Sequence, residues 1–241
     1  MVDGQTEAAI VRRAADNLYG SGQKIWDSND RWNAHKIERI GRFVIKTKAA
    51  RNTANVLDAG SGSTCYAWMP PGRVSMDRFF SQVANKQNAV VGELETLPFA
   101  NEIFDLVFCV GAVIDYASAP AAINELSRVT RTCGRLYLHF ESSSSFEQLG
   151  RPSWNASAYL HETINSSRPD NIWIYSPGFI YRLLRKARFK ILKVEAFHIL
   201  SALLLRLGVS QNQAALAAFV DSAAFLLERF ADDVIVLAEK T

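Results

Sequence analysis

A glycine-rich turn is the segment of this chain whose residue types point most directly to chemistry. The run VLDAGSGST, residues 56–64, passes from an apolar strand into the turn, and Asp58 stands two residues before Gly60. Glycines there let the backbone approach a ligand closely, beyond the carboxyl end of a parallel strand. No Gly-Lys-Ser/Thr follows, which excludes a P-loop, and no third glycine completes a dinucleotide fingerprint. A carboxylate repels a pyrophosphate, so Asp58 favours a ligand with a neutral or cationic centre.

Three more segments follow the turn in a recognisable order. RVSMD ends at Asp77, GELETLPFANEIFDLVF covers residues 92–108, and ELSRVTRTCGRLYLHF leads into a later strand. With the turn as motif I, this series resembles the class I S-adenosylmethionine (SAM)-dependent methyltransferases, in their UbiE-like small-molecule branch (methyltransferase type 11 group). The last segment, DDVIVLAEK, resembles the antiparallel seventh strand of that fold.

The resemblance implies a binding site for SAM, which is released as S-adenosylhomocysteine, and no metal. Asp77 is then expected to bind the ribose hydroxyls, Glu93 the adenine amino group, and the Leu94 N–H a ring nitrogen. The sulfonium and ammonium groups of SAM suit the acidic turn. The cofactor-binding residues implied are Asp58, Gly60, Ser61, Gly62, Asp77, Arg78, Glu93, Leu94, Val110 and Gly111.

Two features depart from the family pattern. Thr64 stands where the turn usually has its last glycine. The stretch between the turn and Asp77 is short and contains Pro70 and Pro71, so the first crossover helix is expected to be truncated. Asp77 and Glu93 are retained, and cofactor binding is therefore still expected.

The elements that position these residues alternate between strands and helices, which is typical of a parallel sheet. We expect an α/β fold: a doubly wound, seven-stranded, mostly parallel sheet with N-terminal helices and a helical insertion between strands six and seven. The expected helices cover residues 5–20, 30–48, 120–130, 176–189 and 200–231. The expected strands cover residues 55–58, 72–77, 89–91, 104–110, 133–141, 190–199 and 232–240. Residues 142–171, rich in Ser, Asn and Pro, are expected to form a long loop with one helix at most.

One methyltransferase domain is expected over residues 1–241. It divides into an N-terminal helical lid (1–48), a SAM-binding core (50–141), substrate-side loop and helices (142–231) and the final strand (232–241). The very apolar helices of 199–231 are expected to pack on the lid or to form a homodimer, because a membrane-surface helix usually carries a Lys/Arg-rich face.

The methyl acceptor is expected over the ends of the fourth and fifth strands. Glu141 and His161 are the candidate catalytic residues, and a solvated carboxylate and a surface histidine are the alternatives. Asp115, Tyr116, Trp154 and Tyr175 are the candidate substrate-binding residues, and a small satellite core is the alternative for the aromatic ones. Tyr19, Trp26 and Trp173 are also placed near the site. His35, His139 and His198 are interpreted as structural, and the serine run 142–145 as a flexible loop.

Composition narrows the class of protein. The chain has 241 residues and a formal net charge of +3, without the basic patch expected of a nucleic-acid binder. Its three cysteines form no CxxC pair, which indicates a reducing, cytoplasmic setting. No signal peptide is expected, and no apolar run is long enough to span a bilayer.

Together these features predict a SAM-dependent methyltransferase acting on an O or C atom of a small, apolar or aromatic molecule. The absent Asn/Asp-Pro-Pro-aromatic signature disfavours amino groups of nucleic-acid bases as acceptors. The alternative is a SAM-binding protein without catalysis that acts as a partner or regulator.

Overall fold

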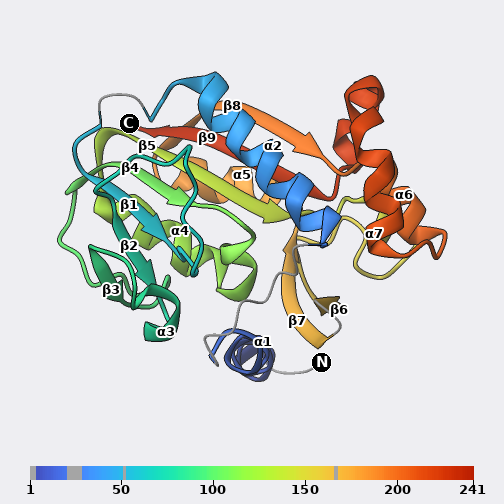
Figure 1. Ribbon diagram of the computed structural model, residues 1–241, viewed down its shortest axis with the longest axis horizontal. Coiled ribbons are helices and arrows are strands. Elements are labelled where there is room, and N and C mark those ends of the chain that lie inside the picture. Colours follow the sequence, from blue (N-terminus) through green and yellow to red (C-terminus); the bar gives the residue numbers. More distant parts are fainter. Residues whose placement is uncertain (1–3, 21–28, 51–52, 166–167) are drawn as a thin grey trace.

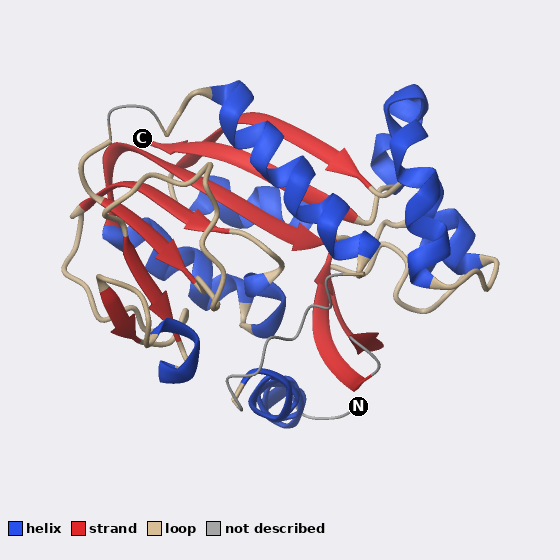
Figure 2. Ribbon diagram, in the orientation of Figure 1, coloured by secondary structure: helices blue, strands red, loops and turns tan. Residues whose placement is uncertain are grey.

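A seven-stranded sheet and a separate two-stranded hairpin form the framework of the protein (Figures 1 and 2). The computed structural model describes residues 4–20, 29–50, 53–165 and 168–241. The strands are β1 (Val56–Ala59), β2 (Val74–Asp77), β3 (Ala89–Val91), β4 (Phe104–Cys109), β5 (Thr130–Glu141), β6 (Ala158–Asn165), β7 (Arg168–Tyr175), β8 (Phe189–Phe197) and β9 (Asp233–Lys240). In the described residues, the order in the large sheet is β3-β2-β1-β4-β5-β9-β8.

The direction of pairing confirms the predicted mostly parallel sheet. β1 pairs in parallel with β2 and β4, β2 with β3, and β4 with β5. β9 runs antiparallel to both of its neighbours, β5 and β8. The carboxyl ends of β1, β2 and β4 therefore meet at one edge, where a ligand can reach all three.

Helices cover both faces of the sheet. They are α1 (Gly4–Tyr19), α2 (Arg31–Thr47), α3 (Phe80–Val83), α4 (Ala119–Val129), α5 (Pro177–Lys186), α6 (Leu200–Arg206) and α7 (Gln211–Ala214), with short 3₁₀ helices η1 (Val113–Tyr116), η2 (Phe146–Gln148) and η3 (Ala215–Phe230). α2 covers one face, where Phe43 packs against Tyr137 of β5 with the ring centroids 6.1 Å apart. α4 and α5 cover the other, where Leu126 and Leu184 join one buried cluster with the strands. α1 lies beside the hairpin (Figure 1).

The first crossover has no helix at all, so the predicted truncation is complete. Residues 60–73 are all described and form only turns and bends. Trp68 stacks on Tyr66 with ring centroids 5.0 Å apart, and it meets Phe108 of β4 at 6.2 Å. At Gly41 of α2, a Cβ atom would come within 2.7 Å of the Trp68 ring. An aromatic pair thus occupies part of the sheet face that a helix would otherwise cover.

The prediction of a long loop over 142–171 is wrong for its second half, which pairs as the β6–β7 hairpin. In β7 the side chains of Asp170, Ile172 and Ile174 are buried, and those of Asn171 and Trp173 between them are less so, which is the two-residue period of a strand. The Ser- and Pro-rich composition obscured this alternation in the sequence. α1 packs against β7, which gives the buried face of the hairpin its partner.

The serine run is a buried turn and not the flexible loop that its composition predicted. Ser142, Ser143, Ser144 and Ser145 are all buried. All four of their hydroxyls take part in hydrogen bonds. Ser143 Oγ donates to the Ala156 carbonyl and Ser144 Oγ to Asn155 Oδ1, and Ser142 Oγ and Ser145 Oγ accept backbone N–H groups two residues later. The turn begins at the end of β5 and is held by contacts from residues far along the chain.

The helical insertion between β8 and β9 confirms the prediction for residues 200–231. Asp221 of η3 accepts the N–H groups of Ile199 and Leu200, both at 3.0 Å, and so caps the start of α6. Leu216 and Phe219 point outward and are largely exposed. No helix in the described part of the chain is long and apolar enough to cross a membrane.

Candidate functional site

The glycine turn after β1 forms the floor of the site. Gly60 has φ +75°, and a Cβ atom there would lie 2.1 Å from Cγ1 of Val113. The N–H groups of Gly60 and Ser61 both donate to the Met76 carbonyl of β2, at 2.8 and 2.9 Å. Gly62 has φ +53° and its position faces open space. The first glycine is therefore required by close packing and a left-handed conformation, whereas the second leaves room for a ligand.

Asp77 at the end of β2 ties the turn to the next element. Its carboxylate accepts the Gly62 N–H at 2.9 Å through one oxygen and the Phe79 N–H at 3.0 Å through the other. Burial raises the pKa of Asp77 despite these hydrogen bonds, which favour the charged form. A carboxylate has about four acceptor positions, so two remain for the hydroxyls of a ligand.

Asp58 forms an ion pair with Arg73 in this structure. The Arg73 Nε lies 3.1 Å from Oδ2 of Asp58, and both side chains are nearly buried. Burial raises the pKa of Asp58, and the cations of Lys86 and Arg73 oppose that shift. Asp58 still lines the cavity described below, so a cationic ligand group would meet a carboxylate that Arg73 already partly neutralises.

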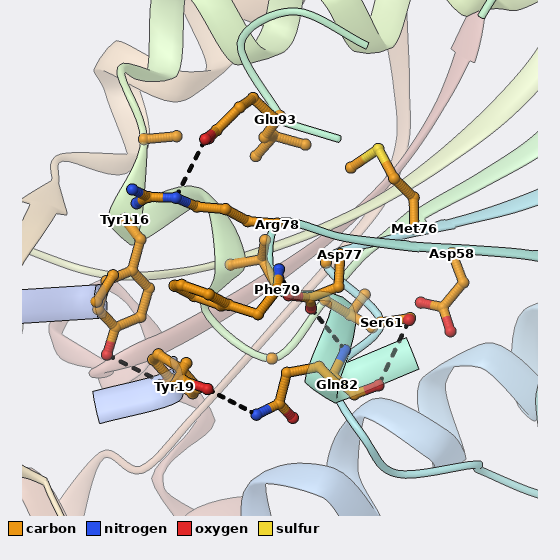
Figure 3. A pocket seen from close by; sticks show the side chains of 18 of the residues that line it. Tyr19, Asp58, Ser61, Met76, Asp77, Arg78, Phe79, Gln82, Glu93 and Tyr116 are labelled. Atoms are coloured by element: carbon orange, nitrogen blue, oxygen red, sulfur yellow. Dashed lines mark hydrogen bonds and ion pairs between the residues drawn. The ribbon is translucent and has the colours of Figure 1, made fainter. Parts of the chain in front are cut away.

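Glu93, after β3, lies in a chain of ion pairs with α1. Its Oε1 is 3.2 Å from Arg12 of α1 and 3.1 Å from Arg78, and Arg78 also contacts Asp16 of α1 at 2.8 Å (Figure 3 shows the Arg78–Glu93 pair). Arg12 could not be found from spacing, because it precedes Glu93 by 81 positions and follows no motif. These contacts hold α1 over the β2–β3 end of the site.

A cavity of about 470 Å³ opens above the turn, a volume typical of small-molecule sites. All ten cofactor-binding residues implied by the sequence line it, from Asp58 to Gly111. Figure 3 labels five of them: Asp58, Ser61, Asp77, Arg78 and Glu93. Gly111 has φ +86° and, like Gly62, faces open space. The lining also includes residues that motif spacing did not single out: Arg12, Asn33, Ile37, Tyr66, Met69, Met76, Phe79, Gln82 and Val113.

Of the four candidate substrate-binding residues, Tyr116 lines this cavity. Asp115 points inward: its Oδ2 accepts the Glu141 N–H, its Oδ1 has no hydrogen-bond partner among the described residues, and burial raises its pKa well above the usual range. Tyr175 is buried, and its hydroxyl donates to the Ala117 carbonyl at 2.6 Å. Trp154 stacks on Phe230 of the insertion, with ring centroids 5.9 Å apart.

The sequence placed three further aromatic residues near the site. Tyr19 and Trp173 line the cavity from α1 and β7. Trp26 lies outside the described residues. The cavity lining thus combines aromatic side chains from α1, η1 and β7, which lie far apart in sequence.

Glu141 and His161 are not among the described residues that line the cavity. Glu141 accepts a hydrogen bond from Lys36 Nζ at 2.7 Å. His161 Nε2 lies 3.8 Å from Glu147, and burial lowers its pKa. Their catalytic roles stay predictions.

A buried ionic network lies behind Glu141. Lys36 Nζ is also 3.2 Å from Asp233, and Asp233 contacts His139 at 3.0 Å and His198 at 2.5 Å. Burial alone lowers the pKa of Lys36, but the carboxylates of Asp233 and Glu141 hold it well above its usual range. Burial raises the pKa of Asp233, but Lys36 and the two histidines outweigh it and hold that pKa well below its usual range. His139 and His198 are fully buried, consistent with the structural role predicted for them.

The residues present fit a nucleoside-bearing ligand. Two carboxylates, Asp77 and Glu93, line the same cavity, and two glycine positions facing open space leave a cradle that Cβ atoms would fill. Among the residues that the structure describes, no group of three or more His, Cys, Asp or Glu side chains could hold a metal ion.

Comparison with known proteins defines the class. Residues 57–138 match the family model described as a methyltransferase domain. The seven-stranded sheet with its flanking helices is the Rossmann-like fold of class I methyltransferases, which confirms the resemblance identified in the sequence.

Particular relatives are similar over part of their length. The chain is 31% identical over 139 residues to malonyl-[acyl-carrier protein] O-methyltransferase of Erwinia pyrifoliae, covering 50% of this chain and 53% of that protein. It is 34% identical over 96 residues to demethylmenaquinone methyltransferase of Mycobacterium tuberculosis, covering 40% of this chain and 39% of that protein. The matched segment thus spans about half or less of these curated relatives.

Two solved structures match over nearly the whole chain. One is 1,6-didemethyltoxoflavin-N1-methyltransferase of Burkholderia thailandensis with bound 1,6-didemethyltoxoflavin and S-adenosylhomocysteine (TM-score 0.60, 14% identity, 100% of this chain and 92% of that chain). The other is the [4+2]-cyclase SpnF (TM-score 0.58, 17% identity, 98% and 94%). At these identities the likeness concerns the fold, and it includes a protein named for a different reaction.

Proposed function

We propose that this chain is a SAM-dependent methyltransferase that moves a methyl group to an O or C atom of a small, apolar or aromatic molecule. One observation carries the proposal: a single cavity is lined by the carboxylates of Asp77 and Glu93 and by two glycines that face open space, Gly62 and Gly111. The matching methyltransferase domain over residues 57–138 supports it.

Bound SAM supplies an electrophilic methyl carbon, and the protein supplies alignment and exclusion of water. Asp77 would accept from the ribose hydroxyls with its remaining acceptor positions. Glu93 would accept from the adenine amino group, and for this it must share its carboxylate with Arg12 or Arg78 or release one of them. Gly62 and Gly111 leave room for the ligand beside the turn.

Several features of the acceptor half support a small aromatic or apolar acceptor. Tyr19, Tyr116, Trp173 and Ile37 line it, and one of the relatives named above is a methyltransferase of demethylmenaquinone. Glu141 and His161 are kept as candidate catalytic residues. The homodimer through residues 199–231 is likewise kept as a prediction.

Calorimetric titration with S-adenosylhomocysteine tests the cofactor site. Asp77→Ala and Glu93→Ala should each weaken binding at least tenfold, because a hydrogen bond to a charged group contributes about 1.5–3 kcal/mol. Glu228→Ala, an exposed carboxylate on η3, is the matched control and should bind normally. Circular dichroism checks folding, and Asp77→Asn keeps the shape of the side chain if Asp77→Ala unfolds. No binding by the unaltered protein would contradict the proposal.

Methyl-labelled SAM and an extract of the source cells test catalysis. Label in small molecules supports the proposal, whereas label in protein or RNA contradicts it. Binding without any labelled product would favour the alternative, a SAM-binding partner or regulator.

A further inference from the structure

A row of three hydrogen-bonding side chains runs from the cavity to a buried carboxylate. The Tyr19 hydroxyl donates to the Tyr116 hydroxyl at 3.2 Å, and the Tyr116 hydroxyl donates to Oδ2 of Asp170 at 2.5 Å (Figure 3 shows the two tyrosines). The tyrosine rings meet edge to face with centroids 5.3 Å apart. Each member comes from a different element, α1, η1 and β7, so the row exists only in the folded chain.

The row lies at the acceptor half of the cavity. Tyr19 and Tyr116 line the cavity, and Asp170 is 1% exposed behind them. Tyr116 follows β4, whereas Glu93 follows β3, and β2 and β1 separate those two strands in the sheet. Tyr116 is thus separated along the sheet from the adenine contact expected at Glu93, whereas the Tyr19 carbonyl accepts a hydrogen bond from Gln82 of α3, just after Asp77. The hydroxyls of the two tyrosines bond to each other and to Asp170, and they are the groups that would meet the second substrate.

The two hydrogen bonds of the row point in the same direction, from the cavity toward Asp170. The proton of Tyr19 points to Tyr116, and that of Tyr116 points to Asp170. Tyr19 therefore keeps oxygen lone pairs that can accept a hydrogen from a ligand. Burial raises the pKa of both phenols above the usual range, so they remain neutral and can pass a proton without storing a charge.

Each carboxylate near the cavity has its own partners. Asp77 holds two backbone N–H groups, Asp58 holds Arg73, and Glu93 holds two arginines. Glu141 is paired with Lys36 at 2.7 Å. Asp170 accepts the Asn171 N–H at 2.8 Å through Oδ1, and its Oδ2 receives the proton of Tyr116.

We propose that Tyr19, Tyr116 and Asp170 form a proton relay for an acceptor that carries a hydroxyl group, and that the methyl group is transferred to that oxygen. The inference rests on the proposed function and deepens it. The acceptor O–H bond breaks as its proton passes to Tyr19 Oη; the Tyr19 proton passes to Tyr116, and the Tyr116 proton to Asp170. The O–CH₃ bond forms as the S–CH₃ bond of the donor breaks, and that electron pair stays on sulfur. Asp170 then returns the proton to solvent through the same path.

Tyr116→Phe and Asp170→Asn test the relay, because each keeps the shape of the side chain and removes one hydrogen-bonding step. Tyr159→Phe and Glu162→Gln are matched controls at exposed positions of β6 in the same hairpin. Methyl transfer from labelled SAM to small molecules of the source-cell extract should fall about 100-fold in the two relay variants and stay within twofold in the controls. S-Adenosylhomocysteine affinity should stay within threefold in all four. Asp170→Glu should recover part of the lost rate.

Two readouts separate a relay from a structural role. Proton NMR of the S-adenosylhomocysteine complex should show an exchange-protected, downfield hydroxyl resonance that Tyr116→Phe abolishes and Tyr159→Phe retains. Carbon NMR of product made with ¹³C-methyl SAM should show an O-methyl group.

The outcomes are distinguishable. An O-methyl product with slow relay variants supports the relay. A C-, N- or S-methyl product, or relay variants as fast as the controls, overturns it and leaves the methyltransferase proposal intact. A protein that binds S-adenosylhomocysteine but labels nothing overturns both proposals.

Discussion

At the scale of the residue, Gly60 and Gly62 stand in one turn but have different neighbours. Both have positive φ, at +75° and +53°. Only Gly60 is packed against another side chain, since a Cβ atom there would overlap Val113. The two glycines therefore differ in what limits them. Packing against Val113 limits Gly60, whereas Gly62 faces the open space of the cavity.

Alanine at these two positions should separate the two constraints. Gly62→Ala is expected to lower the free energy of unfolding by about 1 kcal/mol, for the left-handed conformation alone. Gly60→Ala adds overpacking and should cost about 3 kcal/mol. Urea denaturation of both variants measures the difference. Equal losses would mean that Val113 moves aside without cost.

At the scale of the element, the first crossover has no helix between the glycine turn and β2. The turn is held instead by side chains from other segments. Lys86 Nζ, after α3, donates to the carbonyl oxygens of Ser61 and Thr64, both at 3.1 Å. Thr64, which replaces a glycine, therefore contributes its backbone to this contact. A cation bound to two carbonyls fixes the turn in the absence of the helix.

Removing that cation should loosen the turn. Lys86→Met is expected to weaken S-adenosylhomocysteine binding by roughly three- to tenfold, and Lys86→Arg should retain most of the affinity because it can donate to both carbonyls. Lys190→Met, at an exposed position on β8, is the control. Calorimetric titration measures all three. If Lys86→Met binds as tightly as the unaltered protein, the turn is held by Asp77 and Met76 without Lys86.

At the scale of the whole molecule, a network of histidine and carboxylate side chains joins α2 to the end of β8 and the start of β9. His35 of α2 is 2.9 Å from His198, and His198 is 2.5 Å from Asp233 at the start of β9. Trp32 stacks on His198 with ring centroids 3.9 Å apart. These contacts fasten the helix whose residues Asn33 and Ile37 line the cavity, so the network supports the shape of the site.

The free energy of unfolding should depend on pH because the pKa of His35 is lower in the folded than in the unfolded chain. Burial, then His198 and Arg39, lower its pKa to about 4, against about 6.5 in an unfolded chain. Between those values the unfolded state binds a proton that the folded state does not, so this contribution is complete above pH 6.5 and is lost as pH falls toward 4. The loss is at most about 1.4 kcal/mol per pH unit.

His35→Gln isolates this effect from the other titrating groups. The stability of the unaltered protein relative to His35→Gln should decline from pH 7 to pH 4.5, as measured by urea denaturation at several pH values. A pH-independent difference would show that His35 takes up its proton equally in both states.

Much of the fold could be predicted because its signals are local. An apolar strand such as β4 and the glycines of the turn act through neighbours a few positions away, and the order of four motifs indicated both the sheet and the ten lining residues. The β6–β7 hairpin was missed because its alternation is interrupted by polar residues and is stabilised by α1, more than a hundred positions earlier.

The sequence by itself predicted a seven-stranded, mostly parallel sheet and ten of the residues that line the cavity. Only the tertiary structure decided the order of the strands and which distant side chains meet at the cavity. Tyr19 and Tyr116 are 97 positions apart, and Lys36 and Glu141 are 105 apart. No local pattern specifies such pairs, because their contact depends on how helices pack on a completed sheet. The tertiary structure therefore placed Asp170 behind the two tyrosines and Glu141 beside Lys36, and these placements select the residues to test for catalysis.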